Sequence, residues 1–363
     1  MSRVVSSPYI EWAKLHSHAR WNLATSGVLA VELDELGVTL GDLEITGPSF
    51  YGFPPLQAAL ADAFGVPEAS IVTAIGTSLA NHLALAALIE PGDEVAFEAP
   101  TYEPMMSTAE FLGARVVRFP RPVASLFQID LDALADAVSA RTRVIVLANL
   151  HNPSGAFTDS TMLQQIGRIA DRVGAKVLID EVYLDAVFDQ KPRSAFHLGP
   201  AFVATSSLTK VYGLSGLRCG WIFAEPALAH RIWRLNDLYG NIPAHSAERL
   251  SVVALTKLPF LRERARVLVE TNRALVRDFL ASRNDLEGGL LPYGTTAFPR
   301  VRGGDVSTLC GVLRQDYETT VVPGHFFGVP DRIRIGMGGR TTELREGLER
   351  LGRALDSLRA ARR

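Results

Sequence analysis

Residues 143–181 read RVIVLANLHNPSGAFTDSTMLQQIGRIADRVGAKVLIDE, and this stretch decides the fold of the chain. Its two ends, 143–149 and 176–181, are apolar runs of strand length, and apolar residues recur at helical spacing in 158–174 between them. A strand, a helix and a second strand in this order predict a right-handed crossover between two parallel strands. Because both runs are continuously apolar, we expect helices to bury each strand on both faces.

The alternation of strands and helices continues in both directions from this stretch. Further strand-like runs lie at 94–98, 114–119, 201–205 and 219–224. Helical patterns lie at about 78–90, 103–113 and 130–139, and another begins at about residue 226. From about residue 70 the chain therefore predicts an α/β fold, with a mostly parallel sheet and helices on both faces.

A smaller α+β domain is predicted at the C-terminal end. The stretch 258–283 has apolar residues at helical spacing and is long enough to bridge two domains. Shorter strand-like runs follow at 295–301, 318–322 and 332–337, before a terminal helix that starts at about residue 342. We expect three parts: an N-terminal segment that joins the small domain (1–45), a large domain (46–270) and a small C-terminal domain (271–363).

Composition narrows the classes of function. The 363 residues carry 37 Lys and Arg against 39 Asp and Glu, so the net charge of -2 gives no overall field that would attract nucleic acid or acidic lipid. No segment approaches the roughly 18 consecutive apolar residues of a membrane helix, and the N-terminus lacks the apolar core of a signal peptide. Two cysteines, Cys219 and Cys310, fit a reducing compartment. We expect a cytoplasmic protein without nucleic-acid or membrane partners.

Familiar nucleotide and metal motifs are missing from the sequence. It contains no GxxxxGK[ST], HExxH or GxSxG pattern, and no GxGxxG between a strand and a helix. His16 and His18 alternate in a polar segment, but no acidic or thiol cluster accompanies them. We therefore predict no metal site.

Polar residues instead follow the predicted strands, at the edge where open α/β sheets bind ligands. In IGTSLAN, Gly76, Thr77 and Ser78 open a helix whose free N–H groups suit a phosphate, although helix capping alone would also explain them. In LANLHNPSGA, Asn149 and Asn152 follow a strand; a turn explains the proline and glycine there, but not the amides.

Two later predicted strands are followed by residues that indicate a particular chemistry, a carboxylate and an amine. Asp180 follows a buried run in VLIDEVY, with Tyr183 three residues later, and a carboxylate in that position needs a cation or a donor. In TSSLTKVYGLSGLRCG, Lys210 has small, apolar and aromatic neighbours, with Ser207 and Arg218 nearby in sequence. Burial and a neighbouring cation would lower the pKa of Lys210, so its neutral amine could attack a carbonyl carbon. This amine, the acid, the anion site and the phenol or amide donors match the functional groups of pyridoxal 5′-phosphate.

The sequence resembles the fold-type I pyridoxal phosphate enzymes, and most closely the class I/II aminotransferases. The motifs are GTSLAN, EAPTYEP, NPSG, DEVY and SSLTK with Arg218 eight residues on, in chain order between about Tyr51 and Arg334. The resemblance implies an aspartate aminotransferase-like fold with a seven-stranded sheet, pyridoxal 5′-phosphate as cofactor, and a homodimer with shared active sites.

The resemblance also implies roles for the residues that match. Lys210 is similar to the lysine that forms a Schiff base with the cofactor and later moves a substrate proton. Asp180 resembles the aspartate that keeps the ring nitrogen protonated. Asn152 and Tyr183 resemble the donors to the phenolic oxygen, and Tyr102 the aromatic residue stacked on the ring.

The phosphate contacts implied by the resemblance come from two subunits. Within the chain they are Gly76, Thr77, Ser78, Ser207 and Arg218. Tyr51 resembles the tyrosine that reaches the phosphate of the neighbouring subunit. The sequence after it, YGFPPLQAAL, is shorter than the usual pattern and lacks its second glycine.

Substrate contacts are implied near both ends of the chain. In DRIRIGM, Arg334 resembles the arginine that forks onto the substrate α-carboxylate, with Arg332 as the alternative. Gly27 resembles the glycine whose backbone approaches the substrate, and Asn152 is a further substrate contact. His325 touches substrate or packs within its loop. No arginine is identifiable as a second carboxylate binder, so a dicarboxylate specialist is not supported.

We therefore predict a pyridoxal phosphate-dependent aminotransferase that moves an amino group between an amino acid and a 2-keto acid. The alternative is a lyase, cyclising synthase or oxidase of specialised metabolism, because the same fold and cofactor support several reactions. A regulatory DNA-binding protein would need an added recognition domain, and the residues before Tyr51 leave little room for one.

Overall fold

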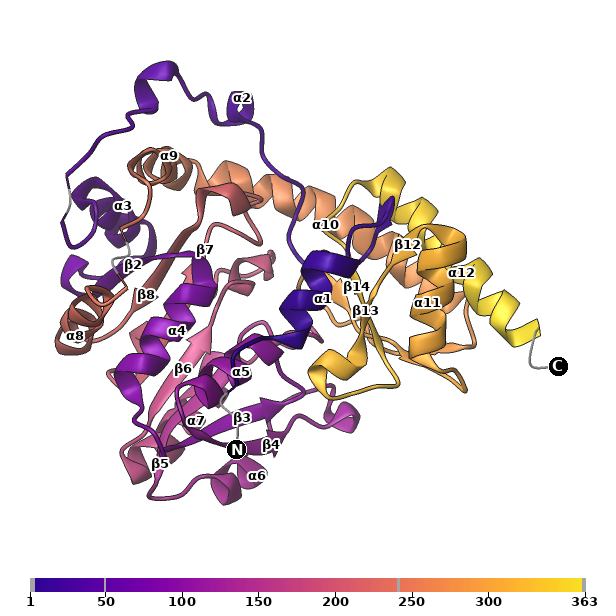
Figure 1. Ribbon diagram of the computed structural model, residues 1–363, viewed down its shortest axis with the longest axis horizontal. Coiled ribbons are helices and arrows are strands. Elements are labelled where there is room, and N and C mark those ends of the chain that lie inside the picture. Colours follow the sequence, from indigo (N-terminus) through magenta and orange to yellow (C-terminus); the bar gives the residue numbers. More distant parts are fainter. Residues whose placement is uncertain (1–3, 49, 240–241, 361–363) are drawn as a thin grey trace.

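A seven-stranded sheet is the centre of the larger part of the molecule (Figure 1). The computed structural model describes residues 4–48, 50–239 and 242–360. In spatial order the strands are β2 (Ile71–Ile75), β8 (Cys219–Phe223), β7 (Phe202–Ser207), β6 (Lys176–Asp180), β5 (Thr142–Ala148), β3 (Glu94–Ala99) and β4 (Arg115–Pro120). Only β8 runs antiparallel to its neighbours, so the predicted mostly parallel sheet is confirmed.

The predicted strands of this sheet agree with the observed ones to within about two residues, which is the usual precision at element ends. The exception is β2, which the sequence analysis did not identify as a strand. Its sequence, IVTAI, runs directly into a helix at Gly76 and has no turn signal to mark its end.

Both faces of the sheet are covered by helices because its central strands carry apolar side chains on both faces. On β5, Val144 and Val146 pack on one face, and Ile145 and Leu147 pack on the other. The first face packs against α4 (Gly76–Leu88), α5 (Glu103–Phe111) and α8 (Pro226–Asn236). The second packs against α6 (Leu131–Ala137) and α7 (Ser160–Val173), while α3 (Pro54–Phe64) and α9 (His245–Thr256) join a separate core with β8.

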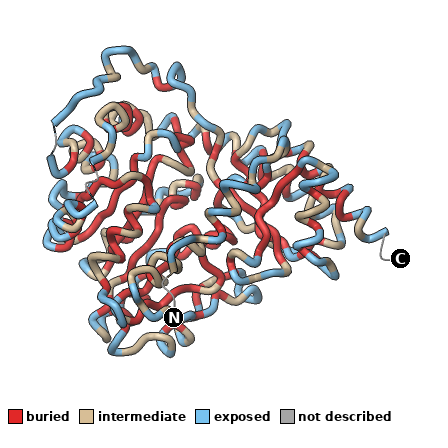
Figure 2. Tube along the Cα trace, in the orientation of Figure 1, coloured by how far each residue is buried: buried red, intermediate tan, exposed pale blue. Residues whose placement is uncertain are grey.

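The C-terminal part has its own small sheets and its own core (Figure 2). Its helices are α10 (Leu258–Ala281), α11 (Val306–Tyr317) and α12 (Thr341–Ala360). Its strands are β9 (Leu286–Glu287), β10 (Thr296–Ala297), β11 (Arg300–Val301), β12 (Thr319–Thr320), β13 (Val322–Pro323) and β14 (Ile333–Gly336). Helix α10 runs from the large sheet to this part and continues through the predicted boundary at residue 270, so the domain limits stay a prediction.

Two strand predictions in the C-terminal part were too long. The run 295–301 splits into β10, which pairs with β14, and β11, which pairs with β9. The run 318–322 splits into β12 and β13, which also pair with different strands. Each half finds a different hydrogen-bonding partner, and a pattern of apolar residues does not record which partner a strand has.

The N-terminal segment lies between the two parts. Helix α1 (Pro8–His16) is capped by Ser7 and packs against α5, and β1 (Trp21–Asn22) pairs in parallel with β12. The segment around α2 (Leu33–Leu36) is largely exposed (Figure 2). Among the described helices, none combines the length and apolar character needed to cross a membrane.

Candidate active site

A cavity opens where β5, β6 and β7 end and α4 begins. Its lining includes Tyr9, Ser26, Thr77, Ser78, Asn81, Tyr102, Asn152, Asp180, Tyr183, Lys210 and Arg218. The carboxyl ends of parallel strands meet at this edge of the sheet, so residues distant in sequence converge there. Most of the cofactor contacts expected from the sequence lie in this one cavity.

The amine of Lys210 is held by a serine. Its Nζ donates a hydrogen bond to Ser26 Oγ at 3.2 Å, and the hydroxyl of Tyr183 donates to the same oxygen at 2.7 Å. Burial lowers the pKa of Lys210, and the positive charges of Arg334 and Arg218 add to this effect. A larger share of the amine is therefore neutral, which is the form that attacks a carbonyl carbon.

Asp180 is a buried carboxyl group at the end of β6. The side chain of Asn81 donates to Oδ2 at 2.9 Å, and the backbone N–H of Val182 donates to Oδ1 at 3.0 Å. The hydroxyl of Thr205 donates to Asn81 Oδ1 at 2.5 Å, which fixes the orientation of that side-chain amide. Burial raises the pKa of Asp180, and these hydrogen bonds together with Lys210 oppose the rise. A cation placed beside this carboxylate would be stabilised by its charge.

The start of α4 has the features of an anion site. The hydroxyl of Thr77 donates to Ser207 Oγ at 2.8 Å, and the backbone N–H of Gly76 donates to the carbonyl oxygen of Arg218 at 2.7 Å. Gly76 has φ +75°, and a Cβ there would come within 2.2 Å of the Arg218 guanidinium. A glycine is therefore required to bring this exposed guanidinium beside the helix N-terminus, where Ser78 is also exposed.

Arg334 lies behind the cavity on β14. Its guanidinium donates to Asn152 Oδ1 at 2.8 Å, to the Tyr9 hydroxyl at 3.0 Å and to the carbonyl oxygen of Ala24 at 3.1 Å. Its Nε is buried and has no hydrogen-bond partner among the described residues. Two of its three partners, Asn152 and Tyr9, line the cavity.

Arg332, the alternative in the same sequence, lies elsewhere. Its guanidinium donates to the carbonyl oxygen of Phe298 at 2.7 Å and sits over the rings of Phe127 and Phe298. Arg332 therefore contacts aromatic side chains of the hydrophobic core, whereas Arg334 contacts residues that line the cavity.

Tyr102 and Tyr9 form an aromatic corner of the cavity. Their rings meet edge to face with centroids 5.5 Å apart. Burial, followed by the nearby Tyr9, raises the pKa of Tyr102 well above its ordinary value, so its hydroxyl stays protonated.

Besides Gly76, Ser207 and Arg334, described above, the expected residues Gly27, Tyr51 and His325 lie outside the cavity lining. Gly27 packs against the backbone at Lys210, and the N–H of Val28 donates to the carbonyl oxygen of Lys210 at 2.8 Å. Tyr51 is about half exposed and donates to Asp237 at 3.0 Å in a separate surface pocket. His325 packs on the ring of Phe326, with centroids 4.1 Å apart.

The sequence analysis missed Tyr9, Ser26 and Asn81. Asn81 follows Thr77 by four residues on the same helix face, so helical spacing was a usable signal. Ser26 is next to Gly27, which the family resemblance had indicated as a substrate contact, so its neighbour could have been considered. Tyr9 had no sequence signal, because its place in the cavity depends on how α1 docks.

The residues of the cavity fit pyridoxal 5′-phosphate. They offer an amine with a lowered pKa, a buried carboxyl group, phenol and amide donors, and a helix N-terminus beside an exposed arginine. No group of three or more His, Cys, Asp or Glu side chains in the described part of the chain is placed to hold a metal ion.

Comparisons with known proteins agree with this geometry. A family model described as aminotransferase class I and II matches residues 41–351. Capreomycidine synthase of Streptomyces vinaceus is 31% identical, over 99% of this chain and 96% of that protein. A probable N-succinyldiaminopimelate aminotransferase of Mycobacterium tuberculosis is 34% identical, over 77% of this chain and 74% of that protein. The crystal structure of a PLP-dependent aminotransferase from Streptococcus suis matches with a TM-score of 0.91 and 26% identity, over 98% of this chain and 99% of that one.

Proposed function

The chain belongs to the aminotransferase class I and II family, and on this basis we propose how its own residues move an amino group between an amino acid and a 2-keto acid. The cofactor is pyridoxal 5′-phosphate. When bound, it supplies an aldehyde carbon for amines and a ring that withdraws electrons from the substrate. One observation carries the assignment of residues: the Lys210 amine, the buried Asp180 and the α4 N-terminus with Arg218 converge in one cavity.

Lys210 is assigned as the residue that binds the cofactor covalently and then carries the substrate proton. Its lowered pKa favours the neutral amine, which can take a proton from the substrate α-carbon and return it. Ser26 Oγ accepts from this amine and from Tyr183, so it holds Lys210 beside the phenol.

Asp180 is assigned as the partner of the cofactor's ring nitrogen. Its carboxyl group is buried, and the donors that reach it, the Asn81 amide and the Val182 N–H, are both neutral. A protonated ring nitrogen would place a positive charge directly against this carboxylate, and the carboxylate would hold that proton in place.

Arg334 is assigned to the substrate α-carboxylate. Asn152 and Tyr9 hold the plane of its guanidinium, and its Nε has no partner among the described residues. A fixed guanidinium favours two parallel hydrogen bonds to a carboxylate. Thr77 and Ser78 at the start of α4, with Ser207 and Arg218 beside it, are assigned to the phosphate.

We also propose a cytoplasmic homodimer with shared active sites. Large apolar side chains are exposed on the chain around Tyr51 and on a loop after α8: Leu40, Ile45, Phe50, Leu238 and Ile242. Such side chains are costly to leave in water and are suited to a second copy of the chain. Tyr51 lies among them, which supports a role for it in the partner's site. Both cysteines are free thiols, which suits a reducing compartment.

The test is a donor and acceptor screen on the holoenzyme. Single amino acids are added, and the absorbance of the bound cofactor is followed; a productive donor converts it to the amine form, and a productive 2-keto acid reverses the change. Borohydride reduction followed by peptide mapping should label Lys210. Transamination is rejected if no donor converts the cofactor, and the assignment of Lys210 is rejected if the label lies on another peptide.

A cyclising synthase is the second candidate. The observation that favours it is the match to capreomycidine synthase over nearly the whole of both chains. A product formed from an amino acid without any 2-keto acid, with the cofactor unchanged at the end, would support this reaction. Strict dependence on a 2-keto acid would support transamination.

A further inference from the structure

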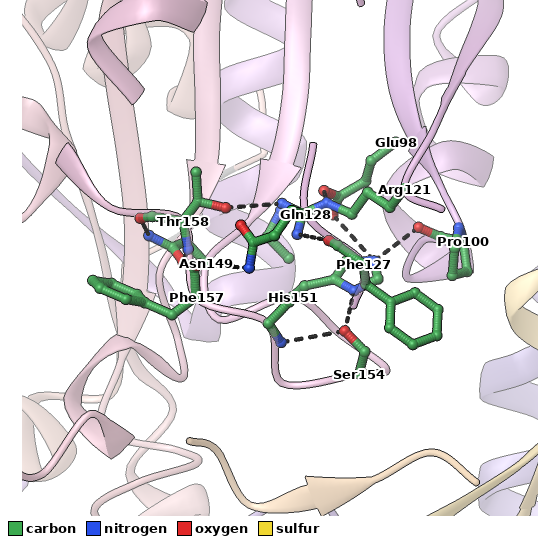
Figure 3. Close-up of polar contacts among 12 residues, drawn as sticks. Glu98, Pro100, Arg121, Phe127, Gln128, Asn149, His151, Ser154, Phe157 and Thr158 are labelled. Carbon is green, nitrogen blue, oxygen red and sulfur yellow. Dashed lines mark hydrogen bonds and ion pairs between the residues drawn. The ribbon is translucent and has the colours of Figure 1, made fainter. Parts of the chain in front are cut away.

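A buried histidine joins two loops at the edge of the sheet (Figure 3). His151 is 1% exposed. Its Nε2 lies 2.9 Å from the carbonyl oxygen of Pro100, in the loop after β3. Its Nδ1 lies 2.6 Å from Ser154 Oγ, in the loop after β5.

The partners of His151 determine where the hydrogens are. A carbonyl oxygen only accepts, so Nε2 carries the hydrogen and donates it to Pro100. Nδ1 is then an acceptor, and the hydroxyl of Ser154 donates to it. Ser154 Oγ in turn accepts from the N–H of Ala156 at 3.2 Å. Burial lowers the pKa of His151 well below its ordinary value, and Arg121 adds to this, so the ring is neutral.

A buried ion pair lies beside this histidine. Glu98 and Arg121 meet at 2.6 Å and are almost completely shielded from solvent. Glu98 also accepts from the N–H of Ala148 at 2.8 Å, which ties the end of β3 to the end of β5. Arg121 donates to Thr158 at 3.2 Å and to the carbonyl oxygen of Phe127 at 3.0 Å. The ion pair and these hydrogen bonds together hold the surroundings of His151 in one arrangement.

The two loops that His151 joins carry residues of the cavity. Tyr102 follows Pro100 by two positions, and Asn152 is the next residue after His151. Both line the cavity, and Asn152 accepts from Arg334 at 2.8 Å. A change in the spacing of the loops would therefore move a cofactor contact and a substrate contact together.

We propose that His151 is a positioning residue that couples the loop carrying Tyr102 to the loop carrying Asn152. Through Asn152 it orients the guanidinium of Arg334, and through Pro100 it sets the place of the Tyr102 ring. The inference rests on the proposed function, since it assigns Tyr102 to the cofactor and Arg334 to the substrate carboxylate.

Three variants of the holoenzyme test the coupling. His151→Phe removes both hydrogen bonds, Ser154→Ala removes only the bond to Nδ1, and His151→Gln keeps a donor toward Pro100. His197→Gln is the matched control, because His197 also bridges a carbonyl oxygen (Phe64, 3.0 Å) and a side chain (Arg193, 3.1 Å), and neither partner lines the cavity. The measurements are KM and kcat for one amino donor, the visible circular dichroism of the bound cofactor, and Tm.

We expect His151→Phe to raise KM for the donor about tenfold, with a smaller change in kcat, because small misplacements of binding groups cost this much. The cofactor's circular dichroism should weaken in the same variant. Ser154→Ala and His151→Gln should show smaller changes in the same direction. His197→Gln should leave KM and the dichroism as in the wild type, even if its Tm falls.

The inference is overturned if His151→Phe changes only Tm and leaves KM and the dichroism unchanged. If that variant does not fold, wild-type KM and dichroism in both Ser154→Ala and His151→Gln overturn it equally. Failure of the proposed function is a separate result: the wild type itself would show no transamination, while the dichroism of the bound cofactor would still report on the coupling.

Discussion

The two walls of the cavity are built in different ways. The wall that we assign to the cofactor carries Thr77, Asp180 and Lys210, which end a strand of one sheet, follow one, or start the helix after one. The substrate wall, as we assign it, carries Tyr9 with Arg334 behind it; the two come from opposite ends of the chain, and the hydrogen bond between them joins residues 325 positions apart. The hydrogen bonds of the sheet hold the first wall in place. The second wall depends on how the two ends of the chain dock against each other.

The docking of the substrate wall uses a few backbone hydrogen bonds. Leu23 donates to the carbonyl oxygen of Thr320 at 2.9 Å, and Gly336 donates to that of Leu23 at 2.7 Å. Val28 donates to Lys210, which attaches the N-terminal segment to the cofactor wall as well. We expect changes on the cofactor wall to lower kcat or cofactor binding, and changes on the substrate wall to raise KM.

Lys210→Ala should give the largest effect of any single change. It removes the nucleophile and the proton carrier together, so kcat/KM should fall by at least about 1,000-fold. Steady-state assays with one donor and one keto acid measure this, together with the loss of borohydride labelling. Lys210→Arg is the control for charge and should be equally inactive. A variant with near wild-type turnover would contradict the assignment.

Asp180→Asn should lower kcat about 100-fold, because the amide no longer stabilises a positive charge on the ring nitrogen. Asp180→Glu keeps the charge and should lose less. The two variants are compared by kcat at saturating donor. Equal kcat values for the aspartate and asparagine forms would show that the charge of Asp180 has no part in the reaction.

Arg334→Lys should raise KM for amino donors about 30-fold with a smaller change in kcat, since lysine cannot form two parallel hydrogen bonds. Arg332→Lys is the matched control two residues away, and it should lower Tm without changing KM. If Arg332→Lys raises KM and Arg334→Lys does not, the two arginines have been assigned in the wrong order.

Tyr9→Phe should raise KM about tenfold, which is the low end of the scale expected for one lost hydrogen bond to a charged group. The ring and its packing remain, so Tm should change little. Trp12→Phe, on the same helix, is the control for packing and should leave KM unchanged. A fall in kcat with constant KM would place Tyr9 on the cofactor wall instead.

Glu181→Gln should have the smallest kinetic effect, because Glu181 lines a different cavity from Asp180 although the two are consecutive. Burial raises the pKa of Glu181 to about 8, against an ordinary value of 4.5. Between these values the folded protein binds a proton that the unfolded chain has released, so this contribution to stability is complete below pH 4.5 and is lost as the pH rises toward 8. Tm of the wild type should therefore fall relative to that of Glu181→Gln over this range. Parallel Tm curves would contradict the shifted pKa.

Much of the cofactor wall could be predicted from the sequence. The runs RVIVLAN and KVLIDE identify buried strands, and the residues directly after them fall at one edge of the sheet. Asp180 and Lys210 were therefore expected together before any tertiary contact was known, and the structure brings them into one cavity. Asn81 was missed although helical spacing placed it beside Thr77.

The substrate wall could not be predicted in the same way. Arg332 and Arg334 stand in one short stretch, DRIRIGM, and the apolar residues on both sides of Arg334 favoured it over Arg332 without showing what either arginine contacts. Arg334 contacts residues that line the cavity because β14 pairs with β13 in a register that sets it opposite Val322, and because α1 brings Tyr9 to its guanidinium. Neither the register of β14 nor the docking of α1 can be read from the residues around the arginines.

By itself, the sequence determined the α/β core, the order of its strands along the chain and the chemistry at their ends, because apolar periodicity and turn residues act over short distances. Only the tertiary structure showed that Arg334 contacts the cavity residues Asn152 and Tyr9, and that Ser26 holds the amine of Lys210. These depend on how segments hundreds of residues apart dock, and docking is set by the shape of whole surfaces rather than by local pattern.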